Sequence, residues 1–265
     1  MSEKKRIVVK VGTSTLTHEN GAIDLRNMER LVRVMADLKG MGHEMILVSS
    51  GAIAVGVAKM SLKERPRNLD EKQAISAIGQ CRMIHMYDTY FSEYNRSIGQ
   101  ILLTGDDVNE PARASHLSNT FEKLLSMGVI PVVNENDSVS SSEIETGSHK
   151  VLGDNDTLSA IVAKLTSADL LILLSDIDGL YDADPRTHTD ATLIHIVKEL
   201  TQEIIDMAGG AGSWRGTGGM ATKISAARIA TDAGCDMVIT NGKHPEDMYG
   251  IVEGREIGTR FIASR

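Results

Sequence analysis

Cysteine is scarce in this sequence, and so are aromatic side chains and an excess of positive charge. Only Cys81 and Cys235 occur, far apart and without metal-ligand spacing, so neither a disulfide framework nor a zinc site is expected. Aspartate and glutamate (36) outnumber lysine and arginine (28), and aromatic residues make up 3% of the chain. Nucleic-acid-binding proteins usually have a basic surface, often with aromatic side chains on which bases stack. We therefore expect no nucleic-acid partner.

Long apolar runs are also missing. No segment approaches the ~20 consecutive apolar residues that cross a bilayer. The first residues, MSEKKRIVVKVG, lack the apolar core and cleavage site of a secretory signal. We expect no membrane association and a cytoplasmic location. The 265 residues are 42% hydrophobic, which is enough for a packed core, and no Gly/Ser-rich or Pro-rich linker divides them. We therefore expect a single domain over residues 1–265.

Short β-rich runs alternate with segments of helical period along the whole chain. Leu170–Leu174 is a continuous apolar run, which is typical of a strand in a parallel sheet covered on both faces. The alternation predicts an α/β fold, a three-layer αβα sandwich with a mainly parallel central sheet. The expected strands are 6–11, 45–48, 98–103, 129–133, 170–174 and 236–240; the expected helices begin at 25 or span 52–57, 75–94, 117–127, 158–165, 203–208 and 220–233. The polar segment 134–154 is expected to be a functional loop, with a disordered insertion as the alternative.

Small, amide and acidic residues follow several of these strands. Ligands bind beyond the carboxyl ends of the strands in open α/β sheets, and small residues let backbone N–H groups approach an anion. The pattern therefore predicts a site for phosphate and other polar groups. Each piece also has a structural alternative: an exposed strand lysine, an ordinary turn, or a helix cap. The segments concerned are Lys10–Ser14, Ser49–Ala52, Asn134–Asp137, Gly153–Asp156 and Ser175–Asp176.

The strongest local signal is GTGGMATK at Gly216–Lys223, directly before a predicted helix. Free N–H groups and the helix dipole favour an anion at such a position, and Lys223 adds a full positive charge. The segment is not a dinucleotide-binding fingerprint, because the residues before it read as a loop and not as a strand. A Walker A motif and the protein-kinase signatures are also absent. A nucleotide-binding protein with this sequence must use another fold family.

Taken together, the motifs resemble those of the amino acid kinase family, and the resemblance covers essentially the whole chain. It is greatest to the branch that phosphorylates glutamate. This resemblance implies transfer of the γ-phosphoryl group of ATP to the side-chain carboxylate of L-glutamate, with Mg²⁺ bridging the phosphates and its protein ligands unknown. The motifs are VKVGTS at Val9–Ser14, SSGAIAVG at Ser49–Gly56, VNENDSV at Val133–Val139, GDND at Gly153–Asp156, SDIDGLYDADPR at Ser175–Arg186, and GTGGMATK at Gly216–Lys223.

The resemblance also implies roles for individual residues. The implied catalytic residues are Lys10, Lys223 and Asp156, with Asp156 orienting the two lysines. The implied glutamate-binding residues are Ser50, Gly51, Ala52, Asn134, Asp137, Asp154 and Asn155. The implied ATP-binding residues are Lys10, Gly12, Ser175, Asp176, Thr217, Gly218, Gly219, Met220, Ala221, Thr222 and Lys223. On this reading residues 1–167 bind glutamate and residues 168–265 bind ATP.

Two other functions remain open at this point: another family member, such as an aspartate or acetylglutamate kinase, and a non-catalytic sensor. Asp137 suits a substrate with a free α-ammonium group, whereas an acetylated amine offers it nothing to pair with. A sensor is expected to have lost the catalytic lysines, yet Lys10 and Lys223 are both present.

The family pattern also bears on assembly and regulation. Many members of the family have a C-terminal PUA domain, and for this chain we expect none after Arg265. We also expect the loop Ser140–Leu152 to be longer than in some relatives. Feedback inhibition by proline is possible, and the resemblance implies a homo-oligomer. The segment Ile75–Tyr94 offers apolar side chains for self-association, with burial inside the monomer as the alternative.

Overall fold

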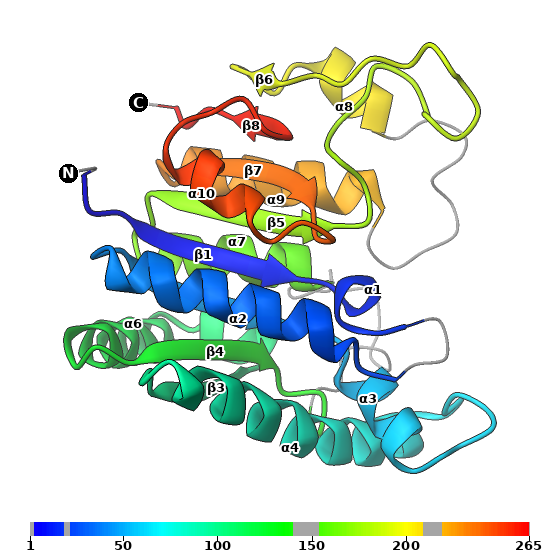
Figure 1. Ribbon diagram of the computed structural model, residues 1–265, viewed down its shortest axis with the longest axis vertical. Helices are drawn as coiled ribbons and strands as arrows, with labels where there is room; N and C mark the ends of the chain where they lie inside the picture. Colours follow the sequence, from blue (N-terminus) through cyan, green and yellow to red (C-terminus); the bar gives the residue numbers. More distant parts are fainter. Residues whose placement is uncertain (1–2, 19–21, 140–153, 209–218, 265) are drawn as a thin grey trace.

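The computed structural model describes residues 3–18, 22–139, 154–208 and 219–264 (Figure 1). Its strands form one eight-stranded sheet in the order β3-β4-β2-β1-β5-β7-β8-β6. Neighbouring strands are parallel except for β7 and β8, which are antiparallel. The expected α/β fold with a mainly parallel sheet is therefore confirmed.

The elements of the described residues have the following bounds. The strands are β1 (Arg6–Val11), β2 (Glu44–Ser49), β3 (Ile98–Leu103), β4 (Ile130–Glu135), β5 (Leu170–Ser175), β6 (Ile196–Val197), β7 (Asp236–Asn241) and β8 (Thr259–Phe261). The helices are α1 (Thr13–Leu16), α2 (Leu25–Gly40), α3 (Ala52–Lys59), α4 (Leu69–Glu93), α5 (Gly105–Asn109), α6 (Pro111–Ser126), α7 (Asn155–Leu165), α8 (Gln202–Ala208), α9 (Met220–Asp232) and α10 (Asp247–Val252).

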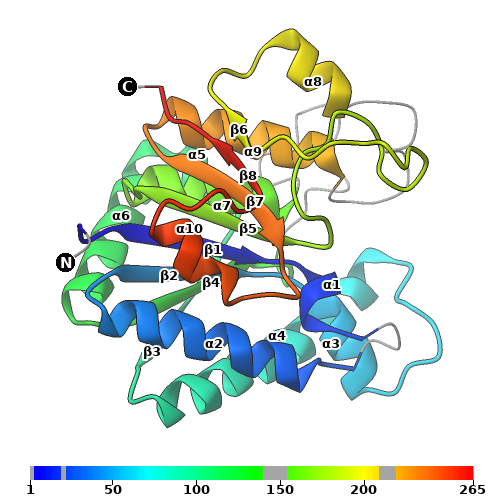
Figure 2. The ribbon, with the colours of Figure 1, turned by 45° about the horizontal axis from the view of Figure 1, so that its top comes forward.

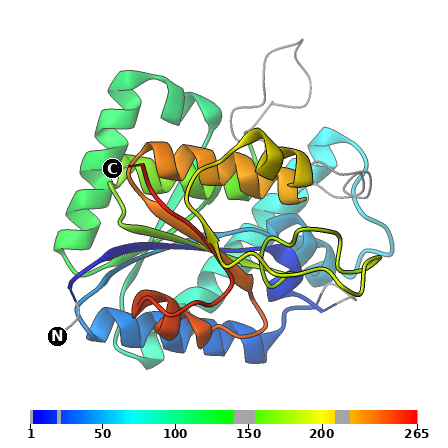
Figure 3. The same cartoon turned by 90° about the horizontal axis from the view of Figure 1, so that it is seen from above.

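The sheet is the middle of three layers (Figures 2 and 3). Helices α2, α4 and α10 cover one face, and α6, α7 and α9 cover the other. Alternation along β1 decides which face each side chain meets. Ile7, Val9 and Val11 pack on the α2 side, whereas Val8 packs on the α7 side. Lys10 has the same parity as Val8, so its side chain is directed to the α7 side as well.

The chain builds the sheet outward in both directions from its centre. Strand β1 pairs with β2 on one side and with β5 on the other, both in parallel. Strands β1–β4 make one half of the sheet and β5–β8 the other, so the connections leave the β1/β5 junction in opposite directions. A junction of this kind opens a crevice at the carboxyl ends of the strands, where α/β proteins bind their ligands.

Most of the expected elements are present, and the helix starts that were placed too late share one cause. The strands 6–11 and 98–103 were placed correctly, but α4 begins at Leu69 and not at Ile75. Asn68 caps α4 by accepting a hydrogen bond from the Glu71 N–H, and the polar first turns carry no apolar period. Helix α6 likewise begins at Pro111, ahead of its first apolar residues. The short elements α1, α5, α10, β6 and β8 were missed.

The apolar side chains of α4 answer the question of where this helix packs. Met83, Met86 and Tyr87 are buried in the core of the monomer, and Ile84 packs against that core. The expected apolar surface for self-association is therefore largely used inside the chain. None of the helices in the described ranges is long and apolar enough to cross a membrane. Of the loop expected at 134–154, residues 134 and 135 belong to β4 and Asp154 caps α7, while residues 140–153 lie outside the described residues. The loop expected at 209–215 lies outside them as well.

Candidate active site

A cleft of ≈ 1380 Å³ opens at the carboxyl ends of the strands, and most of the residues singled out from the sequence line it. Those that line it are Lys10, Gly12, Ser50, Gly51, Ala52, Asn134, Asp137, Asp154, Asn155, Asp156, Ser175, Asp176, Gly219, Met220 and Lys223. Thr222 contacts the cleft indirectly, through a hydrogen bond to Asp156. Ala221 is exposed and is not part of the lining, and Thr217 and Gly218 lie outside the described residues.

The centre of the cleft is the Asp156 carboxylate, which binds two lysines at once. Lys10 Nζ lies 2.6 Å from Oδ1, and Lys223 Nζ lies 3.1 Å from Oδ2. The contact between Lys10 and Asp156 is a close ion pair. Thr222 also donates to Oδ2, at 3.0 Å. Two ammonium groups from distant parts of the chain thus meet on one carboxylate.

Local structure explains how the three charged side chains meet. Asp154 is the N-cap of α7 and accepts hydrogen bonds from the N–H groups of Asp156 and Thr157, which places Asp156 in the first turn. Lys10 reaches it from the α7 side of β1. Lys223 reaches it from the first turns of α9, which packs against α7. The helix-cap interpretation of Asp154 therefore applies, while Asp156 itself is an ion-pair partner.

Because the three charged side chains are largely buried, water screens their electrostatic interactions only weakly. The side chains of Asp156, Lys223 and Lys10 are 1%, 6% and 11% exposed. Burial by itself opposes ionisation of Asp156, but the ammonium groups of Lys10 and Lys223 outweigh it and hold the pKa of Asp156 below its ordinary value. One negative and two positive charges leave a net charge of +1 at this point. That charge faces the cleft and suits a phosphate group.

The loop after β2 forms one wall of the cleft. The Ser50 N–H and hydroxyl both donate to the Val11 carbonyl at 3.2 Å, and the Ser50 hydroxyl lies 3.4 Å from that of Thr13. Gly51 has φ +96°, a left-handed conformation in which a side chain is strained. A Cβ at Gly51 would also come within 3.2 Å of the Thr13 hydroxyl. The glycine thus keeps the backbone close to β1 at the start of α3.

The ends of β5 and β7 form the opposite wall. Asp178 accepts hydrogen bonds from Asn241 (2.7 Å) and from the Tyr181 hydroxyl (3.2 Å), and all three residues line the cleft. None of them was identified as a site residue from the sequence. The rule that ligands bind at strand ends could have found Asn241, because it directly follows the strand predicted at 236–240. Lys72 of α4 also lines the cleft and was not identified from the sequence.

The cleft contains oxygen ligands suited to magnesium but no ready-made cage. No three His, Cys, Asp or Glu side chains gather as a metal site within the described ranges. Mg²⁺ characteristically keeps several waters and binds one or two carboxylates together with substrate phosphates. Asp176, at the end of β5, is an exposed carboxylate on the cleft wall and fits such a contribution.

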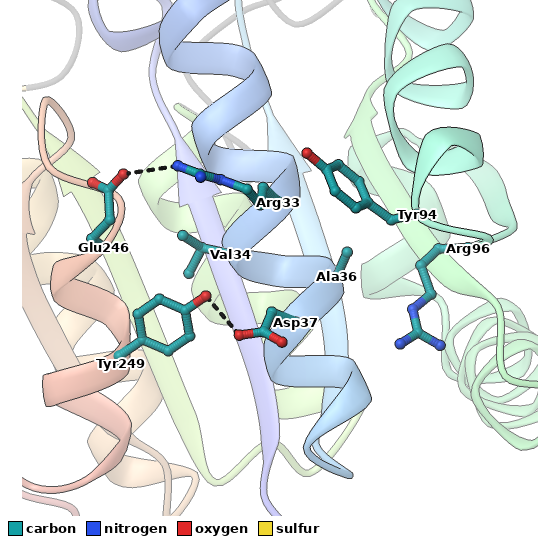
Figure 4. Close-up of a pocket in the computed structure, with 8 residues that line it drawn as sticks. All are labelled: Arg33, Val34, Ala36, Asp37, Tyr94, Arg96, Glu246 and Tyr249. Carbon is teal, nitrogen blue, oxygen red and sulfur yellow. Dashed lines mark hydrogen bonds and ion pairs between the residues drawn. The ribbon is translucent and has the colours of Figure 1, made fainter.

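A second, smaller hollow of ≈ 490 Å³ lies on the outer side of α2 (Figure 4). Its charged groups largely satisfy one another. Arg33 lies 3.5 Å from Glu246, and the Tyr249 hydroxyl donates to Asp37 at 2.8 Å. Because the hollow faces away from the carboxyl ends of the strands, it is not part of the cleft described above.

The fold and the cleft together define a class of phosphotransferase: a parallel α/β sheet with two lysines on one buried carboxylate at its carboxyl edge. A family model described as the amino acid kinase family matches residues 5–241. The chain belongs to the amino acid kinase family.

Individual relatives agree with this assignment. The chain is 52% identical to a glutamate 5-kinase of Clostridium perfringens, covering 100% of this chain and 98% of that one. It is 53% identical to a glutamate 5-kinase of Clostridium tetani, covering 99% and 96%. Among solved structures, a carbamate kinase from Giardia lamblia bound to AMP-PNP has a TM-score of 0.68 at 14% identity, covering 100% of both chains. That structure supports the fold alone.

Proposed function

We propose that this chain transfers the γ-phosphoryl group of ATP to the side-chain carboxylate of L-glutamate, the glutamate 5-kinase reaction and the first step of proline biosynthesis. The observation that carries the proposal is the Lys10–Asp156–Lys223 cluster, set in a cleft between two polar walls. Relatives of this activity that are about half identical over nearly their whole length support it.

The chemistry of the substrate explains why the cleft needs cations and no general base. A glutamate side chain has a pKa of about 4.3 and is already ionised at neutral pH. One of its oxygens attacks the γ-phosphorus, the bond from that phosphorus to the bridging oxygen breaks, and ADP leaves. An anion must approach an anion, so catalysis depends on position and on positive charge.

We assign the two lysines to the phosphates and Asp156 to holding them. Lys10 and Lys223 stabilise the charge on the transferring group, while Asp156 keeps their ammonium groups together in a buried setting. Asp176 would hold magnesium at this wall, and the ion would supply further positive charge on the phosphates. Gly12, Ser175, Gly219, Met220 and Lys223 line the ATP side of the cleft.

We assign glutamate to the other wall, in the part of the chain before residue 168. Ser50, Gly51 and Ala52 offer backbone and hydroxyl donors to its carboxylates. Asn134 and Asp137 offer oxygen atoms to its ammonium group, and Asp154 and Asn155 lie between the glutamate and the phosphates. ATP then occupies the part from residue 168 onward.

The direct test is trapping of an acyl phosphate by hydroxylamine in the presence of ATP and Mg²⁺. We expect hydroxamate with L-glutamate and little with L-aspartate or N-acetyl-L-glutamate, and no ADP formation with UMP. Activity confined to another of these substrates would keep the fold and overturn the substrate. Calorimetric binding of ATP and glutamate without turnover would instead favour a sensor.

Substitution of the lysines tests the assigned roles. Lys10→Met and Lys223→Met should each lower turnover by about 10²–10³, as for other preorganised groups that stabilise developing charge. Lys164→Met is the matched control, because Lys164 is an exposed lysine of α7. Turnover reduced less than fivefold in either cleft variant would contradict the assignment.

Three further expectations follow from family membership. We infer that the chain forms a homo-oligomer, which a monomer mass in light scattering would contradict. Feedback inhibition by proline is a second proposal, which initial rates at several proline concentrations test. Because ATP is the phosphoryl donor, we place the reaction in the cytoplasm, and fractionation of the source cells tests this.

A further inference from the structure

Two polar side chains of α4 lie behind the cleft wall at the end of β4. Ser76 and Gln80 are four residues apart, so they share one face of the helix. The Ser76 hydroxyl donates a 2.7 Å hydrogen bond to Oδ2 of Asp137. Gln80 Oε1 accepts a 2.8 Å hydrogen bond from Nδ2 of Asn134. Asn134 and Asp137 are among the described residues that line the cleft, whereas Ser76 and Gln80 are not.

We propose that Ser76 and Gln80 are positioning residues that make the site selective for a substrate with a free α-ammonium group, by orienting Asp137 and Asn134. This inference rests on the proposed glutamate-binding role of the same wall.

Each of the two hydrogen bonds fixes the orientation of one cleft residue, and so the direction of an oxygen atom that can accept from the substrate. Ser76 is 3% exposed, and its hydroxyl has a single proton to donate, so the bond to Oδ2 fixes the rotation of the Asp137 carboxylate. Gln80 takes the donor end of the Asn134 amide and leaves its Oδ1 as an acceptor. An ammonium group has three donors and no acceptor, so it matches two oriented oxygens, whereas an acylated amine has one donor and no charge.

The position of α4 is itself fixed by backbone contact with α3. A Cβ on Gly79 would lie 1.7 Å from the Ala52 carbonyl oxygen, and one on Gly56 would lie 2.1 Å from the Ile75 carbonyl oxygen. Gly79 directly precedes Gln80, and Ala52 directly follows the Ser50–Gly51 turn. The helix pair therefore connects the β2 end and the β4 end of the glutamate-binding wall, so that Ser76 and Gln80 hold the β4 end in a fixed relation to the β2 end.

The test compares glutamate with glutarate, which has both carboxylates but no amine. For Ser76→Ala we expect KM for glutamate to rise about 10–100-fold, the effect of one hydrogen bond to a charged group. The inhibition constant of glutarate and KM for ATP should stay within twofold. For Gln80→Met we expect a rise of about 2–10-fold, because the lost hydrogen bond is between neutral groups.

Controls separate positioning from a general effect on folding. Ser92→Ala is the matched control, an exposed serine of the same helix, and it should leave all constants unchanged. Ser76→Thr, which keeps the hydroxyl, should restore most of the affinity for glutamate, and the thermal midpoint of Ser76→Ala should stay within a few degrees. Equal weakening of glutamate and glutarate, or no change in either, would overturn the proposal. A wild-type enzyme that forms no glutamyl phosphate would instead overturn the proposed function, and this inference with it.

Discussion

Replacing Asp156 by asparagine tests the electrostatic centre of the cleft most directly. The two contacts, at 2.6 and 3.1 Å, correspond to attractions of about 5–6 kcal/mol each at an effective dielectric constant of 20. Desolvation of the three ions opposes this gain, but replacing Asp156 leaves two like charges close together without the carboxylate that both contact. Breaking such a cluster typically costs about 3–5 kcal/mol. For a chain of this size the thermal midpoint should fall by about 6–20 °C.

Calorimetry and a thermodynamic cycle check this expectation. Lys223→Met should destabilise the wild-type protein, but in the Asp156→Asn background it should cost little or even stabilise, because it relieves the repulsion between two ammonium groups that no longer share a carboxylate. Asp232→Asn, an exposed carboxylate at the end of α9, serves as the control and should leave the midpoint unchanged. Strictly additive effects of Asp156→Asn and Lys223→Met, or a midpoint shift below 2 °C, would refute the reasoning.

The same carboxylate gives the effect a pH dependence with a definite sign. In the folded protein the pKa of Asp156 lies below its ordinary value of 3.8, because the lysine ammonium groups outweigh the effect of burial. Its contribution to stability is therefore fully present above the unfolded-state pKa and is lost as the pH falls through the folded-state value. The stability difference between wild type and Asp156→Asn should be constant from pH 6 to 8 and shrink below about pH 4. A difference that grows on acidification would contradict this.

Two further predictions concern packing and cysteine chemistry. In a denaturant titration, Gly79→Ala should destabilise the chain by about 1–3 kcal/mol, because the new Cβ meets the backbone of α3, and it should raise KM for glutamate more than KM for ATP. Gly40→Ala is the control and should be neutral or stabilising, because the atom nearest to its Cβ, at 3.0 Å, is the end of a flexible arginine. Burial raises the pKa of the Cys235 thiol to about 12, whereas Cys81 is exposed, so a thiol reagent should label one cysteine in the native protein and two after unfolding. Native labelling of Cys235, read by peptide mass, would contradict the second prediction.

The parts of the fold that follow a simple period could be predicted from the sequence. The continuous apolar run at Leu170–Leu174 indicates a strand buried on both faces, and the apolar spacing in α2 indicates a helix buried on one face. The strand, the helix and the α/β class follow from these two patterns. Helix starts such as Leu69 could not be predicted in this way, because the polar first turns of these helices have no apolar period. Strand β8 pairs antiparallel with β7 over three residues, too short a segment for any periodic signal.

The site residues also fall into those that could be predicted from the sequence and those that could not. Strand-end positions such as Ser50 and Asn134 could be found because the carboxyl edge of a parallel sheet gathers them in one place. Alternation along β1 also determines the side to which Lys10 points. No local rule pairs Ser76 with Asp137, which lie 61 residues apart. On a helix, serine and glutamine read as solvent-facing residues, and only the packing of α4 against β4 shows that they face inward.

The arrangement of charge explains why such inward-facing polar residues are needed. The lysine pair attracts any anion, including dicarboxylates without an amine, so it gives reactivity but little selectivity. Selectivity then has to come from acceptors that bind an ammonium group. A site built to hydrogen-bond a substrate group rejects analogues that lack that group. Asp137 and Asn134 are short side chains at a strand end, and free rotation there would reduce the selectivity for substrates that carry an ammonium group. Hydrogen bonds from a helix that is fixed by glycine contacts restrict the rotation, so α4 couples the packing of the fold to the choice of substrate.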